Sequence, residues 1–401
     1  MGKLIGGMLL IVGTSIGAGI LALPVSTSEA GFIGSSLFLL GCWMLMTFCA
    51  FLILEVNLWL PQGSNMISMA KKTLGPYGAA AAWFVYLLLL YSLLCAYVDG
   101  GTDVFTSLLH MAGLPIPEWG SALIFTIILG YIVYLGTRSI DYANRALMFI
   151  KLGSFFVLLF LVSNHIKWEQ LLHSEPHKLL ASVMLMITSF GYATILPSLR
   201  TYFNSDVVAL RKVVILGSLV PLICYILWEL VILGSLPLEG DHGLIYILKT
   251  GHTTSELMAA LDFFIHSDLI TDISRIFISI SVLTSFLGVA LSLSDFLSDG
   301  LKWPKQGFGN IKVYSLTFIP PFIFVIFYPT AFILALKYAG VFCILLLGLL
   351  PVVMAWRGRY HHQLDASFRV PGGKVTLLIA GFITVVLAIF GLLQELQLVS
   401  F

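Results

Sequence analysis

Three glycines interrupt the first long apolar run of the chain, in the stretch GTSIGAG at residues 13–19. Glycine costs about 1 kcal/mol of helix propensity relative to alanine, so Gly13, Gly17 and Gly19 weaken a helix in mid-membrane. Irregular backbone at that depth is tolerated only where it is buried in protein or lines a cavity. The stretch therefore predicts unwinding at 13–19, which frees main-chain groups to bind a ligand. The alternative is a packing face of small residues.

The sixth apolar run contains a second interruption, SFGYATILPSL at residues 189–199. Gly191 stands among small polar residues, and Pro197 removes a backbone donor and clashes with the preceding turn. Taken alone, Pro197 is equally compatible with an ordinary kink. Interruptions at corresponding places, five spans apart, are typical of a transporter with inverted repeats and a substrate site at the midplane.

Together the two breaks predict a binding site for an amino acid. N–H groups at the start of the half-helix after the first break favour a carboxylate. Carbonyls at the end of the preceding half-helix, and near Phe190, can accept an ammonium group. Aromatic side chains at Tyr97, Phe190 and Tyr192 can stack on a substrate ring or bind a phenol, although any one of them taken alone is more often a packing residue. The predicted substrate-binding residues are Gly13, Thr14, Ser15, Gly17, Ala18, Gly19, Tyr97, Ser189, Phe190, Gly191 and Tyr192.

Lys151 lies deep in the fifth apolar run, between Tyr142 and Ser163. Its distance from the nearer end is about 14 Å at 1.5 Å per residue. An ammonium group at that depth is costly and needs acceptors, which Thr284 and Ser285 of the eighth run and the carbonyls of the first break can supply. Burial disfavours the charged lysine, so its amine can gain and lose a proton during a transport cycle. The alternative is a lysine that only braces the break.

Long apolar helices are the elements that must position these groups. The 401 residues are 59% hydrophobic and 10% charged, with a mean hydropathy of +1.00, which is typical of a polytopic membrane protein. A net charge of +1 gives no indication of nucleic acid, and the five cysteines lack the paired spacing of a disulfide or metal site. The eleven apolar runs lie near 4–30, 32–59, 77–109, 118–136, 142–163, 179–203, 207–235, 268–297, 311–328, 330–356 and 374–396.

The distribution of basic residues tests this count, because cytoplasmic loops are rich in Lys and Arg. With the N-terminus inside, 15 of the 21 basic residues fall in inside segments and only Lys167, Lys178 and Lys249 fall outside. We therefore expect eleven spans, a cytoplasmic N-terminus and an external C-terminus. Short surface helices are predicted in SNMISMAKKTLG, HGLIYILKTG and TTSELMAALDFFIH.

For the other charged residues near the spans, the sequence predicts partners or locations but no specific role in transport. Asp272 and Arg275 are spaced to form an ion pair within one helix. Asp99 and Asp103 are expected in an outer vestibule. All nine histidines lie in loops or at span ends, which argues against a histidine proton relay inside the membrane. Carboxylates with partners in the protein interior are predicted at Glu55 and Glu229.

Four segments resemble the hydroxy and aromatic amino acid permease family, most of all its tyrosine-specific permeases: GGMLLIVGTSIGAGILALPV, NRALMFIKL, SFGYATILPSL and TSFLGVALSLSDFLSDGL. The resemblance implies one transmembrane domain over 1–401, with a five-plus-five inverted repeat of the leucine-transporter type. Its repeats are 4–163 and 179–356, and 374–396 is an accessory eleventh span. It also implies proton-driven symport of tyrosine or another aromatic amino acid through a bacterial inner membrane. Lys151 then takes the place of the sodium ion of sodium-coupled relatives.

One departure from the family pattern leaves the substrate open. Members usually show an aromatic–His–Gly run in the break of the sixth span, where this chain has Tyr192-Ala193-Thr194. Alternative substrates are tryptophan, phenylalanine or a hydroxy amino acid. Coupling to sodium is an alternative to proton coupling, and an amino-acid sensor on the same fold is an alternative to a transporter. A channel filter and the residues of an intramembrane enzyme are not visible. The expected partners are an amino acid, a proton and the lipid bilayer, without cofactor, metal, nucleic acid or obligate protein partner.

Overall fold

The computed structural model describes residues 2–17, 19–135, 137–172, 174–303, 305 and 307–395, and every regular element in these ranges is helical. The first part of the chain contains α1 (Gly2–Ser15), α2 (Gly19–Thr27), α3 (Phe32–Leu58), α4 (Met66–Met111), α5 (Glu118–Tyr134), α6 (Thr137–Ser163) and α7 (Trp168–Leu171). The second part begins with η1 (Pro176–Ser182), α8 (Val183–Ser189), η2 (Gly191–Ile195), α9 (Leu196–Tyr202), α10 (Val207–Ser235), α11 (Leu244–Thr250) and α12 (Thr253–Ile265). It ends with α13 (Asp268–Leu301), α14 (Gly307–Phe327), α15 (Phe332–Cys343), the π-helix η3 (Ile344–Leu349), α16 (Leu350–Tyr360) and α17 (Gly373–Glu395).

Helices occupy all eleven predicted apolar runs. Within the described residues, nine spans are long and apolar enough to cross a membrane, the bent pair α1 and α2 makes a tenth, and α5 is a shorter apolar helix of 17 residues. The predicted surface helices also form, as α11, α12 and the first part of α4, which kinks at Gly75 (φ 79°). The chain is therefore an all-helical, multi-pass membrane protein.

The first predicted break is present but shorter than predicted. α1 ends at Ser15 and α2 begins at Gly19, with an angle of 54° between them. The prediction that unwinding begins at Gly13 is wrong, because Gly13 and Thr14 lie within α1. A Cβ on Gly13 would lie 2.5 Å from Cε of Met148 in α6, so this glycine allows close helix packing rather than a bend.

The second break has a different local structure. α8 ends at Ser189, the residues of η2 form a 3₁₀ helix, and α9 begins at Leu196. Pro197 stands in the first turn of α9, where its missing N–H costs little and its fixed φ suits a helix start. Pro197 therefore marks the beginning of the second half-helix rather than a kink within a continuous helix.

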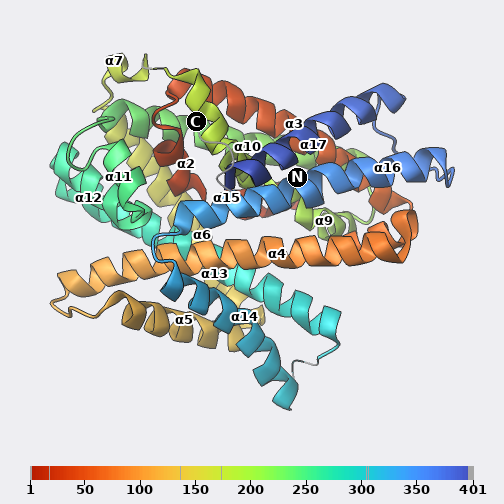
Figure 1. Cartoon of the computed structure of the whole chain (residues 1–401), viewed down its shortest axis with the longest axis horizontal. Coiled ribbons are helices and arrows are strands. Elements are labelled where there is room, and N and C mark those ends of the chain that lie inside the picture. The colour runs from red at the N-terminus through yellow and green to blue at the C-terminus, as the bar shows by residue number, and fades with distance from the viewer. Residues whose placement is uncertain are drawn as a thin grey trace.

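Long helices enclose the two breaks. α4 runs along most of the molecule in Figure 1, with α5 and α14 on one side and α15 on the other. The most extensive packing among the described elements joins α4 with α15 and α6 with α13. α1 packs along α10 and also contacts η2, which places the first break beside the second.

Four charged residues near the spans have the kinds of partner that the sequence predicted. Glu55 of α3 and Arg359 of α16 form a buried ion pair, with 2.5 Å between Oε2 and Nη2. Glu229 of α10 accepts hydrogen bonds from hydroxyls of α2 and α3 at 3.0 and 2.6 Å. Asp272 and Arg275 pair across one turn of α13 at 3.4 Å. The contacts of Glu55 and Glu229, which are both buried, offset the cost of placing these carboxyl groups in the protein interior.

Candidate substrate and coupling site

Lys151 of α6 is buried, with 1% of its surface exposed, and its ammonium group reaches the first break. Nζ donates to the carbonyl oxygen of Ile16 at 2.6 Å and to Oγ1 of Thr284 in α13 at 3.2 Å. The carbonyl is accessible because the amide of Ile20, its partner in a continuous helix, bonds to Gly17 instead, at 3.3 Å. The predicted contacts of the lysine with the first break and with Thr284 are therefore present.

Ser285 follows Thr284 on α13 and faces the glycine of the break. A Cβ on Gly17 would lie 2.7 Å from Oγ of Ser285 and 3.7 Å from the hydroxyl of Tyr97 in α4. The hydroxyl of Ser285 also donates to the main chain one turn earlier, at 2.7 Å. Only glycine allows such a close approach without displacing these side chains. Gly17, Tyr97 and Ser285 thus form one cluster beside the lysine.

Tyr225 of α10 connects the two breaks, although nothing in the sequence analysis selected it. Its hydroxyl oxygen lies 2.6 Å from the carbonyl oxygen of Ser15 and 3.0 Å from that of Ser189, the last residues of α1 and α8. Its ring meets the ring of Phe190 edge to face, with 5.5 Å between centroids. A signal was available, because Tyr225 is the one tyrosine of its span and a buried phenol usually has a polar partner.

The other residues of the second break make contacts away from Tyr225. The hydroxyl of Tyr192 bonds to Oγ1 of Thr47 in α3 at 3.0 Å, which favours a packing role. A Cβ on Gly191 would lie 3.5 Å from Sγ of Cys343 in α15. The Cys343 thiol in turn lies 3.8 Å from the carbonyl oxygen of Ile187. This side of the break is therefore closely packed against α3 and α15.

The remaining predicted residues surround the first break. Ser15 is 7% exposed, and its hydroxyl has no hydrogen-bond partner among the described residues, which is a costly state for a buried polar group. A Cβ on Gly19 would lie 3.7 Å from Oγ of Ser189, so the start of α2 faces the end of α8. Thr14 is exposed and Ala18 lies outside the described residues. The structure brings together Ser15, Gly17, Gly19, Tyr97, Lys151, Ser189, Phe190, Thr284 and Ser285 around the breaks, and it places Gly13, Thr14 and Tyr192 in other contacts.

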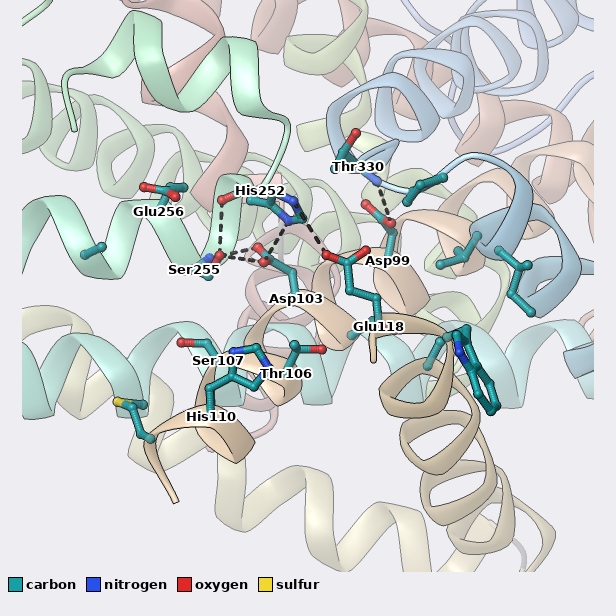
Figure 2. A pocket seen from close by; sticks show the side chains of 18 residues that line it. Asp99, Asp103, Thr106, Ser107, His110, Glu118, His252, Ser255, Glu256 and Thr330 are labelled. Carbon is teal, nitrogen blue, oxygen red and sulfur yellow. Dashed lines mark hydrogen bonds and ion pairs between the residues drawn. The ribbon is translucent and has the colours of Figure 1, made fainter. Parts of the chain in front are cut away.

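A second polar region, which we call the acidic cavity, has a volume of about 890 Å³ (Figure 2). It is lined by α4, α5, α12, α14 and the loops before α12 and α15. Asp103 accepts hydrogen bonds from amides and hydroxyls at the N-terminus of α12, at 2.5 to 3.1 Å. Nδ1 of His252 lies 3.2 Å from Asp103, and its Nε2 lies 3.8 Å from Glu118. The hydrogen bond with Asp103 raises the pKa of His252, in the loop before α12, to about 9.

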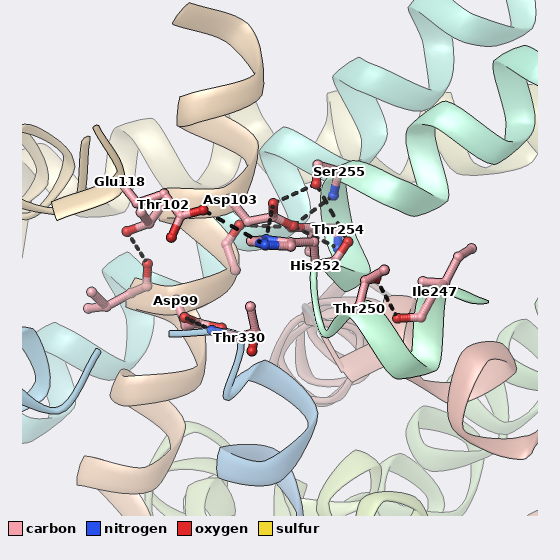
Figure 3. Close-up of polar contacts among 12 residues, drawn as sticks. Asp99, Thr102, Asp103, Glu118, Ile247, Thr250, His252, Thr254, Ser255 and Thr330 are labelled. Atoms are coloured by element: carbon pink, nitrogen blue, oxygen red, sulfur yellow. Dashed lines mark hydrogen bonds and ion pairs between the residues drawn. The ribbon is translucent and has the colours of Figure 1, made fainter. Parts of the chain in front are cut away.

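Asp99 connects α4 to another loop at the same cavity. Its Oδ1 accepts a hydrogen bond from the amide of Thr330 at 3.2 Å, as Figure 3 shows. A Cβ on Gly251 would lie 2.9 Å from the carbonyl oxygen of Thr330, so the loops before α12 and α15 are in close contact. The two carboxylates predicted to share a vestibule, Asp99 and Asp103, do line one cavity and hold both loops to α4.

Comparison with known proteins places these features in a family. The Tryptophan/tyrosine permease family matches residues 1–391. The chain belongs to this family. It is 36% identical to tyrosine-specific transport system 1 of Haemophilus influenzae over 385 residues, which covers 94% of each chain. It is 31% identical to the tryptophan-specific transport protein of the same organism over 406 residues, covering 98% of this chain and 94% of that protein.

The family assignment confirms the resemblance found in the sequence and makes the chain a transporter rather than an enzyme. The permease is also similar to glutamine transporter 2 of Aliivibrio fischeri, with 29% identity over 385 residues, 94% of this chain and 95% of that protein. The substrates in these relatives' names are all amino acids with different side chains. What these substrates share is an ammonium and a carboxylate group.

Proposed function

We propose that the permease is a proton-coupled symporter that carries an aromatic amino acid, most of all tyrosine, into the cell by alternating access. The observation that carries this proposal is Lys151, whose amine bridges the Ile16 carbonyl and Thr284. A movement of the broken first span relative to α13 changes these contacts. The proton affinity of the amine changes with them, so protonation and helix position become linked.

The substrate backbone binds between the two breaks in this proposal. The hydroxyl of Ser15, which has no partner among the described residues, and the first amides of α2 offer donors to a carboxylate. Carbonyls at the ends of α1 and α8 offer acceptors to an ammonium group. Tyr97 and Phe190 are buried aromatic side chains beside the breaks. The relatives named for tyrosine support tyrosine as the first substrate to test.

Contacts of equivalent helices support the five-plus-five inverted repeat, with repeats at 4–163 and 179–356 and an accessory span at 374–396. In such a repeat the first, third and fifth spans correspond to the sixth, eighth and tenth. The two most extensive pairings, α6 with α13 and α4 with α15, are the pairs that this relation exchanges. Lys151 of the fifth span donates to the first break, and Cys343 of the tenth span lies beside the second.

We also propose eleven spans in a bacterial inner membrane, with the N-terminus in the cytoplasm and the C-terminus outside. α5 is the eleventh span in this count. Its 17 residues extend about 26 Å, which is close to the hydrocarbon thickness of about 30 Å. The excess of basic residues in the segments assigned to the cytoplasmic side supports this orientation. With this orientation the acidic cavity opens to the outside, since the loops that line it follow the third, seventh and ninth spans.

Uptake of labelled tyrosine into proteoliposomes tests the proposal. We expect accumulation driven by an inward proton gradient in sodium-free buffer, and inhibition by aromatic amino acids in a panel of twenty competitors. Accumulation that requires sodium would contradict proton coupling and make Thr284 and Ser285 candidate ion ligands. Binding without accumulation under any gradient would favour a sensor instead.

A further inference from the structure

Two main-chain carbonyls from different broken helices converge on one phenol. The hydroxyl oxygen of Tyr225 lies 2.6 Å from the carbonyl oxygen of Ser15 and 3.0 Å from that of Ser189, and the side chain is fully buried. The Ser15 carbonyl also accepts the amide of Gly17 at 2.9 Å. Both carbonyls lie at C-terminal, negatively polarised ends of half-helices. A phenol has one proton, so it donates to only one of the two carbonyls at a time.

An ammonium group would satisfy this arrangement better than a phenol does. It carries a full positive charge and three donors, so it can serve both carbonyls at once with charge-assisted hydrogen bonds. A substrate that bridges the two breaks needs its ammonium group within hydrogen-bond distance of both carbonyls. The oxygen of Tyr225 lies at a position that meets this condition.

We propose that the Tyr225 hydroxyl occupies the ammonium subsite of the empty permease and leaves it when an amino acid binds. This inference rests on the proposed amino-acid site and adds a residue to its mechanism. The phenol keeps the carbonyls paired while no substrate is present, which avoids the cost of unpaired buried acceptors. Its departure moves the ring against which Phe190 packs, so ammonium binding repositions an aromatic side chain of the second break.

A hydrogen bond that exists only in the empty state competes with the substrate. Removing the hydroxyl destabilises the empty protein more than the loaded protein, because in the loaded protein the ligand supplies the donors. A tyrosine that merely braced the two helices would instead stabilise both states equally. The two roles therefore differ in how tyrosine binding changes the effect of the substitution.

The first experiment compares purified wild type and Tyr225→Phe in detergent, measuring the Tm with and without saturating tyrosine and the Kd for labelled tyrosine. We expect a lower Tm for the empty variant, recovery of most of that deficit with tyrosine, and a Kd that falls about 2- to 10-fold. The amine-free analogue 3-(4-hydroxyphenyl)propionate should not restore the Tm. Tyr91→Phe is the matched control, because Tyr91 donates to the carbonyl of Leu316 at 2.7 Å outside this site. Its Tm deficit should be the same with and without tyrosine.

A Kd that stays unchanged or rises in Tyr225→Phe would overturn the inference, as would a Tm deficit that tyrosine leaves intact. If Tyr225→Phe does not fold, a second experiment places 3-fluorotyrosine at position 225 instead. Fluorine makes the phenol a stronger donor, so tyrosine should bind more weakly, and equal or tighter binding would also overturn the inference. If the wild type binds no amino acid at all, the proposed function fails together with this inference. If the wild type binds tyrosine normally and the Kd is unchanged in both variants, only the role of Tyr225 is refuted.

Discussion

The two helix breaks correspond to each other in the proposed inverted repeat, but different chemical groups contact them. At the first break, the ammonium group of Lys151 donates to the Ile16 carbonyl at 2.6 Å. At the second break, α15 places the Cys343 thiol 3.8 Å from the Ile187 carbonyl oxygen. A thiol is a weak and uncharged donor, whereas an ammonium group is strong and changes charge when it loses its proton.

In the proposed symport mechanism, this difference separates the response to protons from the recognition of the substrate. The first break has the titratable contact, so we expect it to respond to protons. The second break has Phe190 and no charged residue among its described contacts, so we expect it to respond to the substrate ring. Tyr225 joins them through one carbonyl of each. Substitutions at each break can show whether the two tasks are separate.

Replacing Lys151 should have the largest effect. Lys151→Ala and Lys151→Arg should each reduce gradient-driven accumulation about 100-fold or more, because alanine carries no proton and arginine does not release one. Exchange of internal for external tyrosine should persist in at least one variant, because exchange needs no net proton movement. Proteoliposome uptake with and without a pH gradient measures both. Accumulation by Lys151→Ala at the wild-type level would remove the lysine from coupling.

A bulky residue at the first break should abolish substrate binding without unfolding the protein. A Cβ on Gly17 already approaches Ser285 and Tyr97, so Gly17→Leu should weaken tyrosine binding about 100-fold through overpacking. Gly153→Leu on α6 is the control, because a Cβ there has no neighbour within 4 Å. Binding to purified protein measures the effect, and chromatographic behaviour checks the fold. Wild-type affinity in folded Gly17→Leu would place the substrate elsewhere.

At the second break, Phe190→Ala should alter selectivity more than coupling. If the ring of Phe190, which packs against Tyr225, also contacts the substrate ring, its loss should weaken binding of tyrosine and tryptophan about 10-fold and of serine or glutamine much less. The response to a pH gradient should remain. Competition against labelled tyrosine gives the relative affinities. A uniform loss for all amino acids would assign Phe190 to packing.

The spans, the interior carboxylates with partners and the contacts of Lys151 could be predicted because burial limits the possibilities. An apolar run of about 20 residues has few alternatives to a membrane helix, and a buried ammonium group must find acceptors. The start of the first break could not be predicted, because Gly13 and Gly17 look alike until helix packing assigns one to Met148 and the other to Ser285. Tyr225 was missed because its partners come from two distant helix ends.

The acidic cavity was only partly predictable for a similar reason. Asp99 and Asp103 are recognisable as charged residues near the end of a span. Their partners, His252 and Thr330, lie in loops more than 100 residues away, and only the tertiary structure brings them together. The pKa of His252 follows from this contact rather than from its sequence neighbours.

The pH response of the acidic cavity should be distinct from that of the first break. Asp103 and Glu118 raise the pKa of His252 from 6.5 to about 9, and Asp99 contributes in the same direction. The stabilisation by this contact is therefore complete below about pH 6.5 and is lost as the pH rises through about 9. Wild-type Tm should fall over that range, and His252→Gln should show a smaller fall.

Accumulation driven by a pH gradient should survive in His252→Gln, because this histidine lies outside both breaks. Its Tm between pH 6 and 10 and its uptake under a gradient can be measured on the same preparation. Loss of gradient-driven uptake with normal exchange would show that coupling involves the acidic cavity as well as Lys151.

Cys343→Ala should have the smallest effect, and it tests the comparison most directly. The thiol lies beside Gly191 and the Ile187 carbonyl, but its hydrogen bond is weak and its loss removes no charge. We expect uptake within about two-fold of wild type, with unchanged dependence on the pH gradient and unchanged selectivity. Cys343→Ser, which supplies a stronger donor in a smaller side chain, should behave similarly. If either variant lost accumulation as Lys151→Ala is expected to, the contact at the second break would be needed for coupling. The two breaks would then act as a symmetric pair rather than as separate sites for proton and ring.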